Sequence, residues 1–116
     1  MDLNFVSDPG LIPRPREEIR IEELIVAPHE TEGRLRVEMV LTPFMPQDRP
    51  NLEIVASGME NDVVGSASVI GALSSSMAIT LHLRRPPAGG VCTVTVTLYY
   101  EEDSPQHTAS QTVRVG

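Results

Sequence analysis

Short segments in which apolar and polar residues alternate dominate this chain, and they restrict its fold to β-structure. The clearest is PPAGGVCTVTVTLYY, residues 86–100. After a Pro/Gly turn, the even-numbered positions from Cys92 to Leu98 are apolar, and the positions between them are Thr93, Thr95 and Thr97. Because neighbouring side chains of a strand point to opposite faces, this pattern predicts a strand with one buried face and one hydroxyl-bearing face.

Six further segments show a similar period, separated by short Gly-, Pro- and Asp-containing turns. They are residues 18–27, 34–43, 51–57, 63–71, 77–85 and 107–115. No window of 11 residues shows a helical period, and the abundant Val, Thr and Ile favour strands. One-sided apolar strands must be buried against a second sheet. The sequence therefore predicts an all-β fold, an immunoglobulin-like antiparallel β-sandwich of about seven strands with Greek-key connections.

The alternation also predicts the core. Aromatic residues make up only 3% of the chain, so the core must be aliphatic. The positions expected to point inward are Leu35, Val37, Met39 and Leu41, then Leu52, Ile54 and Ala56, then Met77, Ile79, Leu81 and Leu83, and finally Ala109, Val113 and Val115, with Gln111 as an exception.

Two segments depart from regular alternation. In EIRIEELIVA, Glu23 interrupts the pattern, and Leu24 and Val26 resume one position out of step. This shift predicts either a β-bulge or a strand that changes sheet. Residues 1–17 are rich in proline and only weakly patterned, so we expect an extended N-terminal arm, followed by a single domain over 18–116. The arm could be a recognition peptide for an aromatic groove or simply a lead-in that lies against the domain.

The last two hairpins, MAITLHLRRPPAGGVCTVTVTLYYEED and HTASQTVRV, resemble those of bacterial immunoglobulin-like or fibronectin type III-like domains. The resemblance covers roughly residues 18–115 and implies the strand order A, B, C, C′ or D, E, F and G. The chain departs from antibody domains in having no Trp and one Cys, and its tyrosines stand at the end of the F strand. In such domains the face formed by C, F and G is a frequent binding surface. The resemblance thus implies an interaction surface of Thr93, Thr95, Thr97 and Tyr99, beside Glu53 and Val55.

Charge and composition exclude several classes of function. The net charge of −7 opposes binding to nucleic acid or to an anionic membrane. All nine basic residues are arginine, so lysine-dependent chemistry is excluded. The lone Cys92 cannot form an intrachain disulfide, and the chain shows neither a secretory leader nor an apolar run of about 20 residues. We therefore expect a cytoplasmic protein.

Candidate catalytic and metal-binding residues do not converge in the sequence. His29, His82 and His107 lie on three different elements and are expected at the surface, and Cys92 shares the apolar face of its strand. No phosphate-binding or GxSxG motif is present. The acidic turns 59–62 and 101–104 could hold Ca²⁺ if they share one end of the sandwich. We predict no catalytic residue, cofactor or resident metal.

The sequence thus favours a non-enzymatic β-sandwich module with an interaction or accessory role. A protein partner or a second copy could be engaged by the threonine face, the proline-rich arm or a free sheet edge. The alternative is a ligand-binding module for calcium or carbohydrate, against which the scarcity of aromatic residues weighs.

Overall fold

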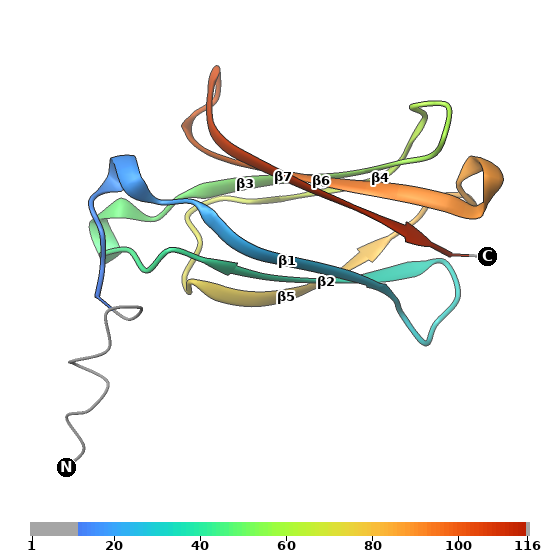
Figure 1. The fold of residues 1–116 in the computed structure, drawn as a ribbon, viewed down its shortest axis with the longest axis horizontal. Helices are drawn as coiled ribbons and strands as arrows, with labels where there is room; N and C mark the ends of the chain where they lie inside the picture. Colours follow the sequence, from blue (N-terminus) through green and yellow to red (C-terminus); the bar gives the residue numbers. More distant parts are fainter. Residues whose placement is uncertain (1–11, 116) are drawn as a thin grey trace, which may run out of the picture.

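Seven strands form two antiparallel sheets in the computed structural model, which describes residues 12–115 (Figure 1). The all-β sandwich expected from the sequence is confirmed. Among the described residues, three short 3₁₀ turns accompany the strands: η3 (Arg16–Glu18), η4 (Pro46–Asp48) and η5 (Ala88–Gly90). The strands are β1 (Ile21–Pro28), β2 (Arg34–Leu41), β3 (Asn51–Ser57), β4 (Val63–Val69), β5 (Ser76–His82), β6 (Val91–Glu101) and β7 (Ser104–Arg114).

One sheet has the order β1-β2-β5 and the other the order β4-β3-β6-β7. They form the lower and upper layers of Figure 1. Strand β4 pairs with β3 and not with the three-stranded sheet, which is the pairing expected of a C′ strand rather than of a D strand. Strands β3 and β6 are the central pair of the larger sheet, with Glu53 opposite Thr97 and Val55 opposite Thr95.

The core between the sheets is aliphatic, as the alternation predicts. Side chains from β2, β3, β5 and β6 meet there with almost no exposure, and burying one aliphatic side chain of this size contributes about 1.5–3 kcal/mol. All predicted inward positions of β2 and β3 are buried, while Met77, Ile79 and Leu83 are partly buried against the core. The fully buried large side chains include Leu35, Val37, Met39, Leu41, Leu52, Ile54, Leu81, Val94, Val96 and Leu98.

The phase shift near Glu23 is a β-bulge. Ile21 pairs with Leu41 and Glu23 with Val40, so Glu22 has no partner of its own on β2. The strand stays in one sheet throughout, which decides between the two alternatives that the sequence left open. Strand β1 begins at Ile21, although Ile19 before it is completely buried.

The bulge has a consequence for the opposite edge of β1, which lies beside β7. Ile21 and Val26 are five residues apart, and in a regular strand their N–H groups would point to opposite edges. The extra residue brings both to the β7 side. There the N–H of Ile21 donates to Nδ1 of His107 (3.0 Å), and the N–H of Val26 donates to Oε1 of Gln111 (2.6 Å).

His107 and Gln111 therefore join the two sheets by side-chain hydrogen bonds instead of a backbone ladder. These bonds explain why the polar Gln111 stands at a position of β7 where the alternation leads one to expect an apolar residue. They also correct one expectation, since His107 is half-buried between the sheets and is not a plain surface histidine. On this edge of β1 the N–H groups of Ile21 and Val26 thus have side-chain acceptors, which leaves fewer free donors for pairing with another strand.

On the other side of the sandwich, the start of β4 crosses the end of β5. The N–H of Arg84 donates to the carbonyl of Val64 at 2.7 Å. Gly65 is required at this crossing because a Cβ atom there would lie 2.7 Å from the carbonyl oxygen of His82. The glycine that weakens the strand pattern in the sequence thus permits close approach of two backbones.

Candidate functional site

The three threonines singled out in the sequence lie on the outer face of the β4-β3-β6-β7 sheet. Thr93, Thr95 and Thr97 are partly exposed, whereas the residues between them on β6 are buried. Tyr99 continues the same row toward the β6–β7 hairpin and is half-buried. The structure therefore places all four residues together on one face, while their role in binding stays a prediction.

Strand β7 adds a second row of hydroxyls that the sequence reasoning missed. Thr112, Ser110 and Thr108 stand directly opposite Thr93, Thr95 and Thr97. The hydroxyls of Thr93 and Thr112 lie 3.0 Å apart, and Ser110 donates to Thr95 at 3.0 Å. Such cross-strand pairs stabilise an antiparallel sheet and hold the side chains in place. Hydroxyl residues stand at every second position of TASQT, residues 108–112, and this is the sequence pattern from which the second row could have been predicted.

The outer face is completed by β3 and β4. Glu53 accepts a hydrogen bond from the hydroxyl of Ser68 at 2.9 Å, and Ser66 lies opposite Val55. The result is a polar, hydroxyl-rich surface, on which Val55 is the main aliphatic residue of the central strands. We refer to this surface, made by Glu53, Val55, Ser66, Ser68, Thr93, Thr95, Thr97, Tyr99, Thr108, Ser110 and Thr112, as the hydroxyl face.

A hollow of about 250 Å³ opens at one end of the hydroxyl face. It is lined by Glu53, Thr97, Tyr99, Glu102 and Pro105. Because two carboxylates and a tyrosine line it, the hollow suits a partner group that is neutral or positively charged. Tyrosine side chains that become buried in an interface often supply much of its binding energy.

The two acidic turns proposed for calcium lie at opposite ends of the sheet. Ser57, which precedes the first turn, pairs with Thr93, whereas Asn51 pairs with Tyr99 beside the second. In Figure 1 the β6–β7 hairpin is at the upper left and the β3–β4 turn at the upper right. A shared calcium site is therefore wrong. Within residues 12–115, no three His, Cys, Asp or Glu side chains form a group that could hold a metal ion.

Cys92 is a core side chain, as the sequence predicts. It lies on β6 and is completely buried in the core. Burial raises the pKa of its thiol above 9.0, the nearby Asp62 carboxylate adds to the increase, and a backbone hydrogen bond from Ser57 opposes it. Since the thiolate is the nucleophilic form, this environment disfavours reactivity at neutral pH.

Arg14 and Arg16 of the predicted arm, residues 1–17, are in contact with the sandwich; the part of the arm before residue 12, with the proline at position 9, lies outside the described residues. The N–H of Arg14 donates to the carbonyl of Pro43 (2.9 Å). Arg16 forms an ion pair with Asp48 (3.1 Å), and its guanidinium lies 4.6 Å from the ring centroid of Tyr100. The hydroxyl of Tyr100 donates in turn to the carbonyl of Asp48 (2.7 Å). The division at residue 17 stays a prediction.

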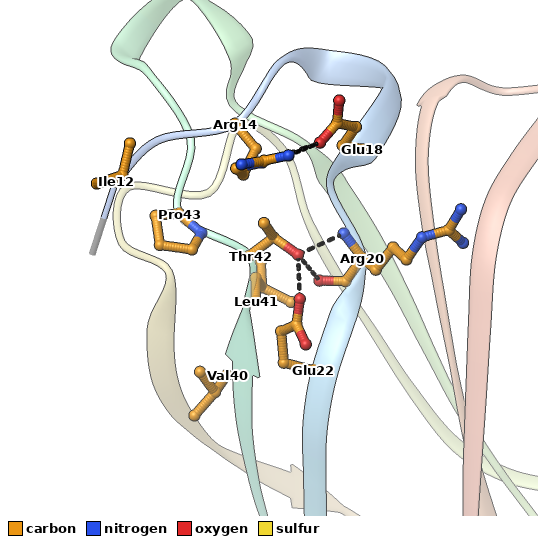
Figure 2. A pocket seen from close by; sticks show the side chains of 9 residues that line it. All are labelled: Ile12, Arg14, Glu18, Arg20, Glu22, Val40, Leu41, Thr42 and Pro43. Atoms are coloured by element: carbon orange, nitrogen blue, oxygen red, sulfur yellow. Dashed lines mark hydrogen bonds and ion pairs between the residues drawn. The ribbon is translucent and has the colours of Figure 1, made fainter. Parts of the chain in front are cut away.

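A larger hollow of about 560 Å³ lies between this segment and the β1–β2 edge (Figure 2). At its floor Thr42 is buried; it accepts from the N–H of Arg20 (3.0 Å) and donates to the Glu22 carboxylate (2.6 Å). Arg14 and Glu18 pair across the rim at 2.6 Å. Because these polar groups satisfy one another, we assign the hollow to the attachment of the segment rather than to chemistry.

Comparison with known proteins supports the fold of the chain but does not assign the chain to a family. No protein-family model matches the chain, and no curated protein matches it in sequence. Among solved structures, it is similar to part of a Bifidobacterium dentium β-glucuronidase complexed with coumarin-3-O-glucuronide, with a TM-score of 0.66 and 11% identity over 85% of this chain and 18% of that one.

Two further structures show a similar likeness. A Parabacteroides merdae β-glucuronidase gives a TM-score of 0.62 at 12% identity, over 84% of this chain and 14% of the other. A glycosyl hydrolase family 2 member from Bacteroides cellulosilyticus gives 0.58 at 13% identity, over 84% and 15%. The chain thus spans less than a fifth of the length of these proteins. At such low identity the likeness concerns the β-sandwich fold alone.

Proposed function

We propose that this chain is a non-enzymatic accessory module that binds a protein partner through the hydroxyl face. The observation that carries the proposal is the double row of hydroxyls on β6 and β7, which ends at Tyr99 and its hollow. The face spans four strands, is held in register by side-chain hydrogen bonds between β6 and β7, and carries one carboxylate, Glu53, on its central strands. A surface that is already ordered loses little conformational entropy on binding.

Two further observations support an accessory role. The solved structures that resemble the chain contain the similar sandwich as a small part of much longer proteins. The residues from 12 to 115 also bring no catalytic side chains together: Cys92 is buried, and His29, His82 and His107 lie on separate elements. The immunoglobulin-like or fibronectin type III-like family remains part of this proposal, supported by the strand order.

The chemistry of the face favours a protein over other partners. The net charge of −7 opposes nucleic acid and anionic membranes. None of the helical turns in residues 12–115 is long and apolar enough to cross a bilayer. Carbohydrate binding is less favoured, since sugar rings usually stack on exposed aromatic rings and Arg16 covers Tyr100. We keep the cytoplasm as the proposed location.

The test compares three tagged chains in a pull-down from the source lysate, quantified by mass spectrometry. These are the wild type, Thr95→Arg on the hydroxyl face, and Thr80→Arg on the outer face of the other sheet. Both substitutions put the same large cation on the outer face of a sheet, at a partly exposed position in Thr95→Arg and at an exposed one in Thr80→Arg. We expect a stoichiometric protein that is retained by Thr80→Arg and lost by Thr95→Arg. Equal retention by both variants would place the binding surface elsewhere and overturn the proposal.

A further inference from the structure

The end of the sandwich opposite the N-terminal segment carries a basic hollow of about 400 Å³. The β1–β2 turn forms one wall and the link between β5 and β6 forms the other (right-hand end of Figure 1). Arg34 comes from the first wall, and Arg84 and Arg85 come from the second. The sequence reasoning did not single out these arginines, although the pair RRPP at residues 84–87 stands out in an acidic chain.

The charged side chains that line the hollow are mainly basic, although the protein as a whole is acidic. Three of the nine arginines of a chain with net charge −7 line it, together with His29 and one carboxylate, Glu32. Among residues 12–115, no carboxylate lies within ion-pairing distance of Arg34 or Arg84. Arg85 lies 3.6 Å from the carboxylate of Asp62. Two of the arginines that line the hollow, Arg34 and Arg84, therefore have no ion-pair partner in this part of the chain.

The backbone around these arginines is fixed. The N–H of His29 donates to the carbonyl of Arg34 (3.0 Å), which closes the β1–β2 turn. The N–H of Leu83 donates to the carbonyl of Gly33 (2.8 Å), which ties the two walls together. The side chain of Arg84 also donates to the carbonyl of Val63 (3.3 Å). A guanidinium has five donors, so most of those on Arg84 and Arg34 remain available to a ligand.

Apolar side chains complete the lining. Leu83, Pro86, Pro87 and Val115 line the same hollow as the charged groups. A volume of this size is within the range of small-molecule sites, which are typically apolar with a few polar groups that fix orientation. Planar guanidinium groups match the geometry of a carboxylate, which they bind by two parallel hydrogen bonds.

We propose that this hollow binds an organic carboxylate whose apolar body contacts the proline and leucine side chains, with Arg34 and Arg84 holding the carboxylate. The carboxylate could belong to a free small molecule or to an acidic residue of a peptide. This site lies away from the hydroxyl face and goes beyond the function proposed above. Its test uses no protein partner, so the two proposals succeed or fail separately.

The test is a ¹H–¹⁵N NMR titration of the full chain with three probes at constant ionic strength. The probes are sodium hexanoate, the blocked dipeptide acetyl-Leu-Glu-amide, and inorganic phosphate. We expect saturable shifts around Arg34 and Arg84, with a Kd of about 1 mM or tighter, for at least one carboxylate. The probe that binds more tightly identifies the source of the carboxylate.

Three variants test whether Arg34 and Arg84 are responsible for carboxylate binding. Arg34→Gln and Arg84→Gln are each expected to weaken binding about tenfold, since a hydrogen bond to a charged group is lost. Arg49→Gln, at the other end of the sandwich, removes the same charge and should leave binding unchanged. The proposal is overturned if neither carboxylate binds at 50-fold the expected Kd, if phosphate binds as tightly as the carboxylates, or if Arg34→Gln and Arg49→Gln behave alike in folded protein.

Discussion

Oε1 of Gln111 accepts a hydrogen bond from the backbone N–H of Val26 at 2.6 Å, across the seam between the two sheets. The bond makes a polar side chain part of the join between β7 and β1. It depends on the bulge at Glu22, which turns the N–H of Val26 toward β7.

Gln111→Ala should lower the free energy of unfolding by about 1–3 kcal/mol, because the N–H of Val26 would lose its acceptor in a partly buried place. Thr108→Ala, an exposed change on the outer face of the same strand, should change it by less than about 0.5 kcal/mol. Urea unfolding of the two variants measures the difference. Similar values for both would mean that the seam bond contributes nothing.

Gly65→Ala should be more harmful than its size suggests. The added methyl would lie 2.7 Å from the carbonyl oxygen of His82 at the β4–β5 crossing, so backbone must shift. We expect a loss of about 1–3 kcal/mol, against less than about 0.5 kcal/mol for the exposed neighbour Ser66→Ala. Thermal unfolding of both variants provides the check. If Gly65→Ala unfolds at the same temperature as the wild type, the two backbones approach each other less closely at this crossing than described.

Removal of the segment before residue 18 should weaken the sandwich. A chain that starts at Glu18 lacks Arg14 and Arg16, and with them the ion pair to Asp48 and the contact with Tyr100. Because these groups are about half exposed, we expect a loss of only about 1–2 kcal/mol relative to a chain that starts at Ile12. Denaturant unfolding of the two shortened chains gives the answer. Equal stability would favour a simple lead-in over a structural segment.

Alkaline pH should destabilise the fold through Tyr100 and Cys92. Burial raises the pKa of Tyr100 above 10.0, the Arg16 guanidinium lowers it, and the Asp48 carboxylate raises it, for a net increase. A group with a raised pKa in the folded state holds its proton longer there than in the unfolded chain. Its stabilisation is therefore complete below the unfolded pKa and is lost as pH rises through the folded one. The pKa of Cys92 is raised in the same direction from 9.0.

Stability should accordingly fall as pH rises above about 9. Tyr100→Phe should be about 1 kcal/mol less stable than the wild type at pH 8, because the hydrogen bond to Asp48 is lost. The gap should narrow above pH 10, because there the phenol ionises in the unfolded wild type before it ionises in the folded state. Urea unfolding at pH 8 and at pH 10.5 tests this. A gap that widens with pH would contradict the raised pKa of Tyr100.

The sequence predicted the strands and their faces because alternation reports directly on burial. Leu35 to Leu41 and Cys92 to Leu98 lie as expected, since each strand buries one face only. The sequence predicted less about residues whose contacts are with residues far away along the chain. His107 and Gln111 look like ordinary polar residues until β1 is placed beside them, 85 or 86 positions away.

The same limit applies to the candidate sites. The row from Thr93 to Tyr99 lies on one strand and was visible in its period, whereas the basic hollow joins Arg34 to Arg84 through the β1–β2 turn and the end of β5. The acidic turns were misplaced for a similar reason. Which turns share an end depends on the direction of β3 relative to β6, and the spacing of residues does not contain that direction.

Binding through the hydroxyl face is the central claim, and photo-crosslinking in the source cells tests it most directly. A photoreactive phenylalanine derivative would replace Tyr99 at the rim of the hydroxyl face in one chain, and Thr80 on the opposite sheet in another. We predict one dominant protein adduct from position 99 and none from position 80. Adducts of equal yield from both positions, or an adduct from position 80 alone, would contradict the account.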